Sequence, residues 1–285
     1  MVNKQVVMMT KTTKTLRALP SAVLLLATAT ALSACTNLES RVVQENGRAV
    51  EIVTAGAGPA TVVFESGLGA DWSPWDAVAS DLSADARIFA YSRPGYGDSA
   101  GATTPRDAAT IVEELRALLQ HQGYAPPYIL VGHSFGGTYM ELFARLYPGE
   151  VSGLVLVDAR PDDFLARCEA AGLDMCGISA PDLASLSAVQ IAEYRAFPQA
   201  SAELASAGGF GSYPVRVLTA LAGRGSEARR ALWEDMHAAL AAEAADGRQI
   251  VFEGAGHNLQ IERPSGVAKA IRALLPAATG TAASR

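Results

Sequence analysis

The hydrophobic and polar positions divide the chain into short apolar runs and longer segments with helical periodicity. Short apolar runs that end at turn residues are typical of β-strands. Helical patterns at about 105–120 and 138–147 lie between them. This alternation predicts an α/β fold with a mostly parallel central sheet and helices on both faces. The predicted strands are 47–54, 60–65, 87–91, 128–131, 153–158, 215–220 and 249–252.

The first two predicted strands are separated by Gly56-Ala57-Gly58-Pro59. A short turn-rich connection of this kind predicts a hairpin-like pair. Residues 36–47 are polar and predict a tether that leads into the first edge strand. We therefore assign 35–47 to a tether, 48–275 to one large domain and 276–285, which begins with a proline, to a disordered tail.

The amino-terminal segment has the pattern of a secretory signal. Residues 1–34 contain four basic and no acidic residues, and 18–32 are apolar. The segment ends in Leu32-Ser33-Ala34-Cys35, which looks like a bacterial lipobox with Cys35 as the lipid-modified first mature residue. An A-x-A-type cleavage site is the alternative. The lipobox implies export and lipid anchoring to a membrane of the cell envelope, and Thr36 implies the outer membrane in a Gram-negative host.

The predicted mature chain is acidic. The whole chain has 23 Lys and Arg against 29 Asp and Glu, and without the four basic residues of 1–34 the formal charge is −10. A strongly negative domain repels the phosphate backbone, so nucleic acid is excluded as the expected partner.

The segment 128–147 contains the clearest chemical motif. An apolar strand leads into Gly132-His133-Ser134-Phe135-Gly136-Gly137, and a helical pattern follows. Glycines on both sides of a serine permit a sharp strand-to-helix turn that presents the hydroxyl, and the helix amino terminus favours an anion beside it. Ser134 is therefore the candidate nucleophile.

With this strand, motif and helix the chain resembles the α/β-hydrolase superfamily, from about residue 48 to about residue 275. The resemblance implies the α/β-hydrolase fold with a small helical cap. It also implies an oxyanion hole formed by the backbone N–H groups of Leu68 and Phe135. The loop at Leu68 reads Glu-Ser-Gly-Leu-Gly, where the superfamily often has His-Gly.

The candidate acid is Asp158, which ends a strand that the sequence predicts to be buried on both faces. In most of the superfamily the acid follows the next strand, but no Asp follows 215–220 at the expected place. Haloalkane dehalogenases carry their acid after the earlier strand, and Asp158-Ala159-Arg160-Pro161 resembles that variant. Asp162, Asp163 and Glu227 remain as alternatives.

The candidate base is His257, in a Gly-Ala-Gly-His loop that resembles the histidine loop of the superfamily. The other histidines are His121 at a helix end, His237 inside a helical segment, and His133, whose side chain we expect to point away from the working face of the nucleophile. The order Ser, Asp, His along the chain matches the superfamily.

The combination predicts a serine hydrolase that cleaves an ester, thioester or lactone through an acyl-enzyme, without a metal or cofactor. A serine at the turn argues against epoxide hydrolase or dehalogenase chemistry, which uses an aspartate there. The alternatives are an amidase, C–C bond hydrolase or perhydrolase, and a catalytically silent binding module at the cell envelope. Residues 161–213 predict a cap whose apolar side chains favour a small-molecule substrate with an apolar acyl group.

Two cysteines remain besides Cys35. In an exported protein Cys168 and Cys176 are expected to form a disulfide, and two separate buried thiols are the alternative. Metal binding is not expected, because no histidine or acidic cluster lies beside them at ligand spacing.

Overall fold

The computed structural model describes residues 38–276. The predicted signal peptide, the lipidation site Cys35 and tail residues 277–285 lie outside the described residues, so export and lipid anchoring stay predictions. Within 38–276 no helix has the length and apolar character needed to cross a membrane.

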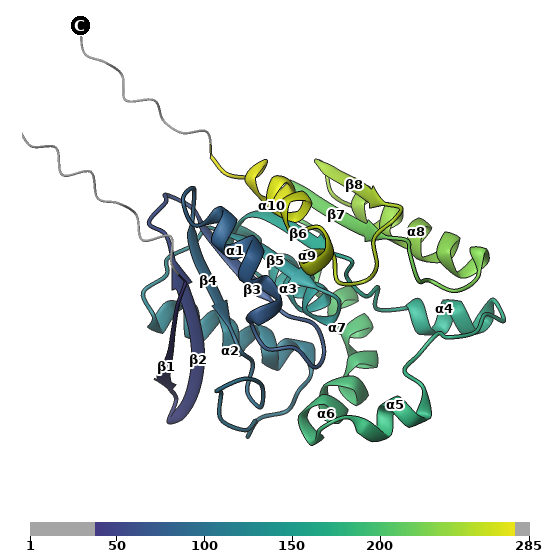
Figure 1. Cartoon of the computed structure of the whole chain (residues 1–285), viewed down its shortest axis with the longest axis horizontal. Coiled ribbons are helices and arrows are strands. Elements are labelled where there is room, and N and C mark those ends of the chain that lie inside the picture. The colour runs from purple at the N-terminus through teal and green to yellow at the C-terminus, as the bar shows by residue number, and fades with distance from the viewer. Residues whose placement is uncertain (1–37, 277–285) are drawn as a thin grey trace, which may run out of the picture. The chain divides into compact units, whose positions relative to one another are not determined.

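The described residues contain one eight-stranded sheet (Figure 1) in the order β1-β2-β4-β3-β5-β6-β7-β8. The pairs β1–β2 and β2–β4 are antiparallel, and all other neighbours are parallel. The strands are β1 (Glu39–Glu45), β2 (Arg48–Ala55), β3 (Thr61–Glu65), β4 (Arg87–Tyr91), β5 (Tyr128–His133), β6 (Val151–Val157), β7 (Val215–Ala220) and β8 (Gly247–Phe252).

The amino-terminal hairpin differs from the prediction. Residues 39–45, which we assigned to the tether, form edge strand β1, and β1 rather than β3 pairs with β2 as a hairpin. Its turn is Asn46-Gly47, with positive φ at both residues, as a two-residue hairpin requires. Strand β3 is buried along its whole length and lies between β4 and β5, because its apolar centre, residues 62–64, favours a central position.

Helices cover both faces of the sheet (Figure 1). One face carries α1 (Asp76–Leu82), α9 (Leu259–Glu262) and α10 (Pro264–Arg272), and the other carries α2 (Ala108–His121), α3 (Phe135–Leu146) and α8 (Glu227–Ala242). Short 3-10 helices lie at Ser73–Trp75, Pro148–Glu150 and Phe197–Gln199. The α/β-hydrolase fold is confirmed.

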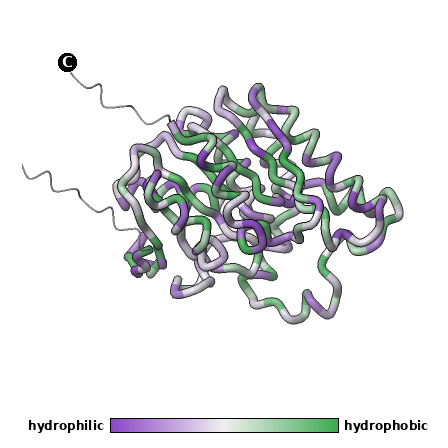
Figure 2. Tube along the Cα trace, turned by 45° about the horizontal axis from the view of Figure 1, so that its top comes forward, coloured by the Kyte–Doolittle hydropathy of each residue, from purple (hydrophilic) through white to green (hydrophobic). Residues whose placement is uncertain are grey.

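Alternate residues of the central strands supply the two cores. Val63 and Leu130 pack under α2 and α3, whereas their neighbours Phe64 and Val131 pack under α1 and α10. Figure 2 shows hydrophobic residues along the strands in the middle of the domain and more hydrophilic residues along its outer turns and helices. The sheet is therefore a rigid platform with buried faces.

Four helices connect β6 to β7, in the segment where the sequence predicts a cap. They are α4 (Phe164–Ala170), α5 (Ala180–Ser185), α6 (Ala188–Ala196) and α7 (Ala200–Ala207). A disulfide joins Cys168 in α4 to Cys176 in the loop after it. The half-cystines pack with Phe164 and with Trp233 of α8, so the bridge ties this loop to a small apolar cluster.

Candidate active site

Ser134 lies at a strained turn between β5 and α3. Its backbone has φ 54° and ψ −122°, a conformation that costs about 1–3 kcal/mol for a residue other than glycine. The turn is tight, because a Cβ at Gly132 would lie 2.3 Å from the carbonyl oxygen of Gly136. A Cβ at Gly136 would lie 2.5 Å from the carbonyl oxygen of Ser66. The two glycines thus permit the turn that exposes the serine hydroxyl.

Three side chains far apart in sequence form one chain of hydrogen bonds. The Ser134 hydroxyl lies 3.0 Å from Nε2 of His257, and Nδ1 of the same imidazole lies 2.6 Å from Oδ2 of Asp158. They follow β5, β6 and β8, whose carboxyl ends meet at one edge of the sheet. The structure therefore brings together the three predicted catalytic residues in hydrogen-bonding order.

The surroundings of Asp158 keep its carboxylate charged. Oδ1 accepts hydrogen bonds of 2.9 Å from the Ala220 N–H and from Nε1 of Trp233, and Oδ2 forms an ion pair with Arg224. Burial alone would raise the pKa, but the hydrogen bond to His257 and the charge of Arg224 outweigh it and lower the pKa of Asp158 to about 2. The carboxylate can therefore stabilise an imidazolium at neutral pH.

His133 lies behind the candidate base rather than beside the nucleophile hydroxyl. Its ring centroid is 4.6 Å from that of His257, and its Nε2 lies 2.9 Å from the His257 carbonyl oxygen. Burial, reinforced by the neighbouring His257, lowers the pKa of His133 to about 3, so the ring is neutral and Nε2–H donates to this carbonyl. His133 thereby supports the loop that carries the base.

A pocket of about 480 Å³ opens beside Ser134 and His257. Leu68 and Phe135, the predicted oxyanion-hole residues, also line it. Phe135 is the first residue of α3, where backbone N–H groups have no partner within the helix. The pocket therefore brings the candidate nucleophile and the candidate base together with a helix amino terminus, which favours negative charge.

A buried ionic network connects the loop at Leu68 to the cap. Arg93, in the turn after β4, donates to the carbonyl oxygens of Ser66 and Gly67 at 2.5 and 2.9 Å. The same guanidinium binds Glu65 at 2.5 Å and Glu193 of α6 at 3.0 Å. Although burial opposes it, the two carboxylates raise the pKa of Arg93 well above its ordinary value. Arg93 thus binds both the loop that precedes Leu68 and helix α6.

We expect Glu193→Gln to lower the free energy of unfolding by about 3 kcal/mol, because Arg93 would remain buried with half of its charge compensation lost. Urea denaturation followed by circular dichroism measures the change. Glu169→Gln, at an exposed cap position, is the matched control and should stay within about 0.5 kcal/mol of wild type. Equal stability of the two variants would contradict a structural role for the Glu193 carboxylate.

The alternative acids lie away from the hydrogen-bonded chain. Asp162 and Asp163 line a different pocket, and Glu227 begins α8 and also lines another pocket. His237 is buried between Thr219 and the Ala159 carbonyl. None of these four side chains contacts Ser134 or His257 among the described residues.

The sequence analysis missed two residues that hold the acid, Arg224 and Trp233. Arg224 follows β7 at the same sheet edge as Asp158, so the rule that located the acid also applied to this arginine. Trp233 lies inside α8, and no local signal distinguishes its role from ordinary packing. Arg93 lies in the turn after β4, and no local pattern indicates its contact with Glu193, which spans 100 positions in the sequence.

Comparison with known proteins matches part of the chain to a family described as alpha/beta hydrolase fold, over residues 60–173. The uncharacterized protein YqjL of Bacillus subtilis is 35% identical over 36% of this chain and 41% of its own length. A pimeloyl-[acyl-carrier protein] methyl ester esterase of Edwardsiella ictaluri is 36% identical over 38% of this chain and 40% of its own. The chain thus spans at most about two fifths of the first curated relatives.

The crystal structure of Cfl2 from Burkholderia cenocepacia superposes with a TM-score of 0.65 at 21% identity. The superposition covers 84% of this chain and 96% of that one. This likeness concerns the fold, whereas the site described above rests on the side chains of this protein.

Proposed function

We propose that this chain, which has the α/β-hydrolase fold and matches that family over residues 60–173, is a serine hydrolase acting on a carboxylic ester, thioester or lactone. The observation that carries the proposal is the continuous hydrogen-bonded chain from Ser134 through His257 to Asp158 beside an open pocket. The esterase among its relatives supports the choice of an ester.

The proposed mechanism uses only side chains and backbone of this protein. His257 removes the proton of Ser134 as the hydroxyl oxygen attacks the substrate carbonyl, and Asp158 orients the imidazole and stabilises its charged form. The N–H groups of Leu68 and Phe135 stabilise the oxyanion, each by about 3 kcal/mol in the transition state. His257 then protonates the leaving group, and water, activated by the same histidine, releases the acid and restores Ser134.

Active-site labelling tests this proposal in the full-length chain, purified in a neutral detergent. We expect a fluorophosphonate to add once per chain at Ser134, detected by mass spectrometry, and p-nitrophenyl butyrate to be hydrolysed. A folded chain with neither labelling nor turnover would contradict the proposal and favour a silent binding module. Labelling without ester turnover would direct the search to the corresponding amides, C–C bonds or peracids.

A further inference from the structure

The pocket beside Ser134 and His257 is lined by three arginines and by no acidic residue. They are Arg160, Arg224 and Arg229, and the other lining residues are apolar side chains, glycines and the two catalytic groups. Because the whole chain carries a formal charge of −6, this local excess of positive charge runs against the overall composition. Cations in a recessed site concentrate the field and attract anionic ligands.

Arg224 is not available to bind a substrate anion, because it pairs with the proposed catalytic acid, Asp158. It forms an ion pair with Asp158, donates from Nε to the Ala220 carbonyl at 3.1 Å, and stacks 3.8 Å from the Trp233 ring centroid. Its charge is therefore largely balanced within the protein.

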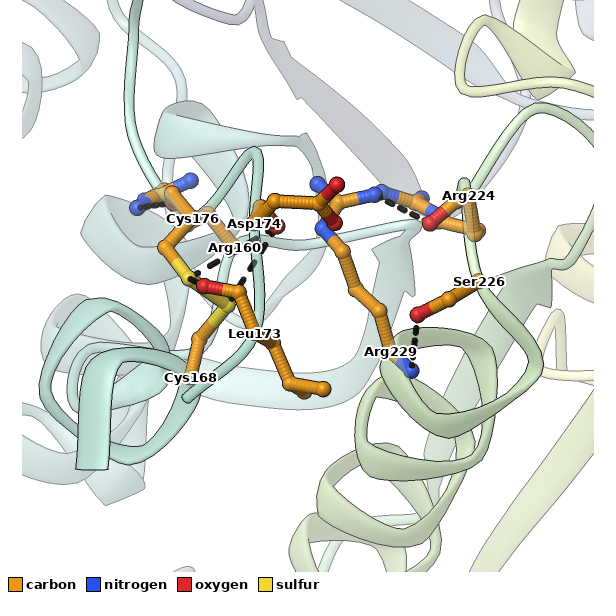
Figure 3. The surroundings of a disulfide bond; sticks show 8 residues. All are labelled: Arg160, Cys168, Leu173, Asp174, Cys176, Arg224, Ser226 and Arg229. Carbon is orange, nitrogen blue, oxygen red and sulfur yellow. Dashed lines mark hydrogen bonds between the residues drawn. A yellow bond between two sulfur atoms is a disulfide. The ribbon is translucent and has the colours of Figure 1, made fainter. Parts of the chain in front are cut away.

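Arg160 and Arg229 form no ion pair among the described residues. Burial lowers the pKa of Arg229, and the charge of Asp174 offsets this only in part. Nη2 of Arg160 donates to the Cys176 carbonyl at 3.1 Å, and Nη1 of Arg229 donates to the Arg224 carbonyl at 2.5 Å (Figure 3). Across residues 38–276 no carboxylate lies within ion-pair distance of either guanidinium, and the buried Nε of Arg229 has no hydrogen-bond partner. Their other side-chain N–H groups make no hydrogen bond to the described residues.

The two guanidinium groups line the same pocket and lie near the same buried aromatic ring. Their Cζ atoms lie 5.4 and 5.5 Å from the ring centroid of Phe164. Burial lowers the pKa of Arg160, and the like charges of Arg229 and Arg224 lower it further, although Tyr194 opposes them. A bound anion would relieve this repulsion and satisfy the free donors.

The position of Arg160 relative to the nucleophile is fixed by the backbone. Its N–H donates to the Ser134 carbonyl at 3.0 Å, and its own carbonyl accepts from Thr138 at 2.8 Å. The Arg160 side chain donates to the carbonyl of Cys176, and the disulfide between Cys168 and Cys176 closes the loop that carries this carbonyl (Figure 3). An anion bound here would therefore lie in the same pocket as the carbonyl that Ser134 attacks.

We propose that Arg160 and Arg229 bind an oxyanion of the substrate, so that the preferred ester carries a carboxylate or phosphate near the scissile carbonyl. This inference rests on the proposed serine hydrolase function. The sequence analysis expected a substrate with an apolar acyl group, whereas this proposal adds an anionic group to the substrate. A planar guanidinium pair matches the geometry of carboxylate and phosphate oxygens.

Two p-nitrophenyl esters with acyl chains of equal length test the proposal. One is the adipate monoester, which ends in a carboxylate, and the other is the neutral hexanoate; spontaneous hydrolysis is subtracted. We expect kcat/KM of the full-length enzyme to favour the adipate monoester. Arg160→Gln and Arg229→Gln should each reduce the adipate-to-hexanoate ratio about 10- to 100-fold, because each removes charge-assisted hydrogen bonds. Arg160→Lys, which keeps the charge, should retain part of the preference.

Arg230→Gln is the matched control, because Arg230 is the next residue of α8, is exposed and pairs with Glu253 outside the pocket. It should leave the ratio at its wild-type value. A wild-type enzyme that prefers hexanoate, or a ratio unchanged in both the Arg160→Gln and Arg229→Gln variants, overturns the proposal.

Calorimetry with adipate and with glycerol phosphate separates this proposal from the proposed hydrolase function. If no ester is hydrolysed, binding of either anion that weakens in Arg160→Gln still supports the anion site. Binding of neither anion overturns it. Tighter binding of adipate assigns the anion to a carboxylate of the acyl part, and tighter binding of glycerol phosphate assigns it to a phosphate of the alcohol part.

Discussion

Ser134→Ala is expected to lower kcat for p-nitrophenyl butyrate by about five to six orders of magnitude. The substitution removes the proposed nucleophile while the pocket, the helix amino terminus and the Phe135 N–H remain, so only the residual rate supported by the proposed oxyanion hole and by substrate binding should persist. Release of p-nitrophenolate, recorded at equal concentrations of wild type and variant, measures the change. The free energy of unfolding should change little, because alanine occupies the same strained backbone conformation as serine.

The control for this loss is Ser206→Ala, at an exposed position of cap helix α7. It should keep the wild-type kcat. Loss of activity in Ser134→Ala alone, after the same purification, excludes a contaminating esterase as the source of the activity. If folded Ser134→Ala retained more than about one hundredth of the wild-type rate, Ser134 would not be the nucleophile.

The parts of the site that the sequence could predict depend on local patterns. Ser134 and His257 were located because each lies in a glycine-rich turn directly after an apolar run, and such turns form at the carboxyl edge of a parallel sheet. Asp158 was located in the same way, as the polar end of a strand buried on both faces. The structure places these three side chains in hydrogen-bonding order.

Long-range pairing is what the sequence could not supply. The pattern placed β2 and β3 in one hairpin because they are adjacent, but the actual partner of β2 depends on the Asn46-Gly47 turn and on the need to bury β3 between two other strands. Nor does any local signal indicate that Arg93 meets Glu193, or that Arg160 and Arg229 share one pocket with Ser134. These contacts join segments far apart in the sequence and arise only in the folded chain.

The acid is the residue whose assignment most needs a direct test, because Asp158 follows an earlier strand than in most of the superfamily. Asp158→Asn is expected to lower kcat about 10⁴-fold. Asn keeps an oxygen for the Ala220 N–H and Trp233, but its amide donates to Nδ1 of His257. That hydrogen bond places the imidazole proton on Nε2, where it can no longer accept the proton of Ser134.

The same substitution should change stability in a pH-dependent way. The folded-state pKa of Asp158 is about 2, below the ordinary value of 3.8. The ionised carboxylate therefore contributes about 2 kcal/mol of stability above about pH 4, and this contribution is lost as pH falls towards 2. An asparagine at this position cannot make this contribution, and it leaves the Arg224 guanidinium without an ion-pair partner. Wild type should thus exceed Asp158→Asn in unfolding free energy at neutral pH, by a margin that narrows in acid.

Glu227→Gln is the control, because Glu227 is an acid near the same sheet edge but does not contact His257 among the described residues. It should retain wild-type kcat and wild-type pH dependence of unfolding. If Asp158→Asn kept activity within tenfold of wild type, the hydrogen bond from Asp158 to His257 would be structural only. The acid would then have to be sought at Asp162 or Asp163. We expect kcat to fall in Asp158→Asn but not in Glu227→Gln, and the difference in unfolding free energy between wild type and Asp158→Asn to shrink at low pH. Both results together would show that the Asp158 carboxylate orients His257 and also balances the charge of Arg224.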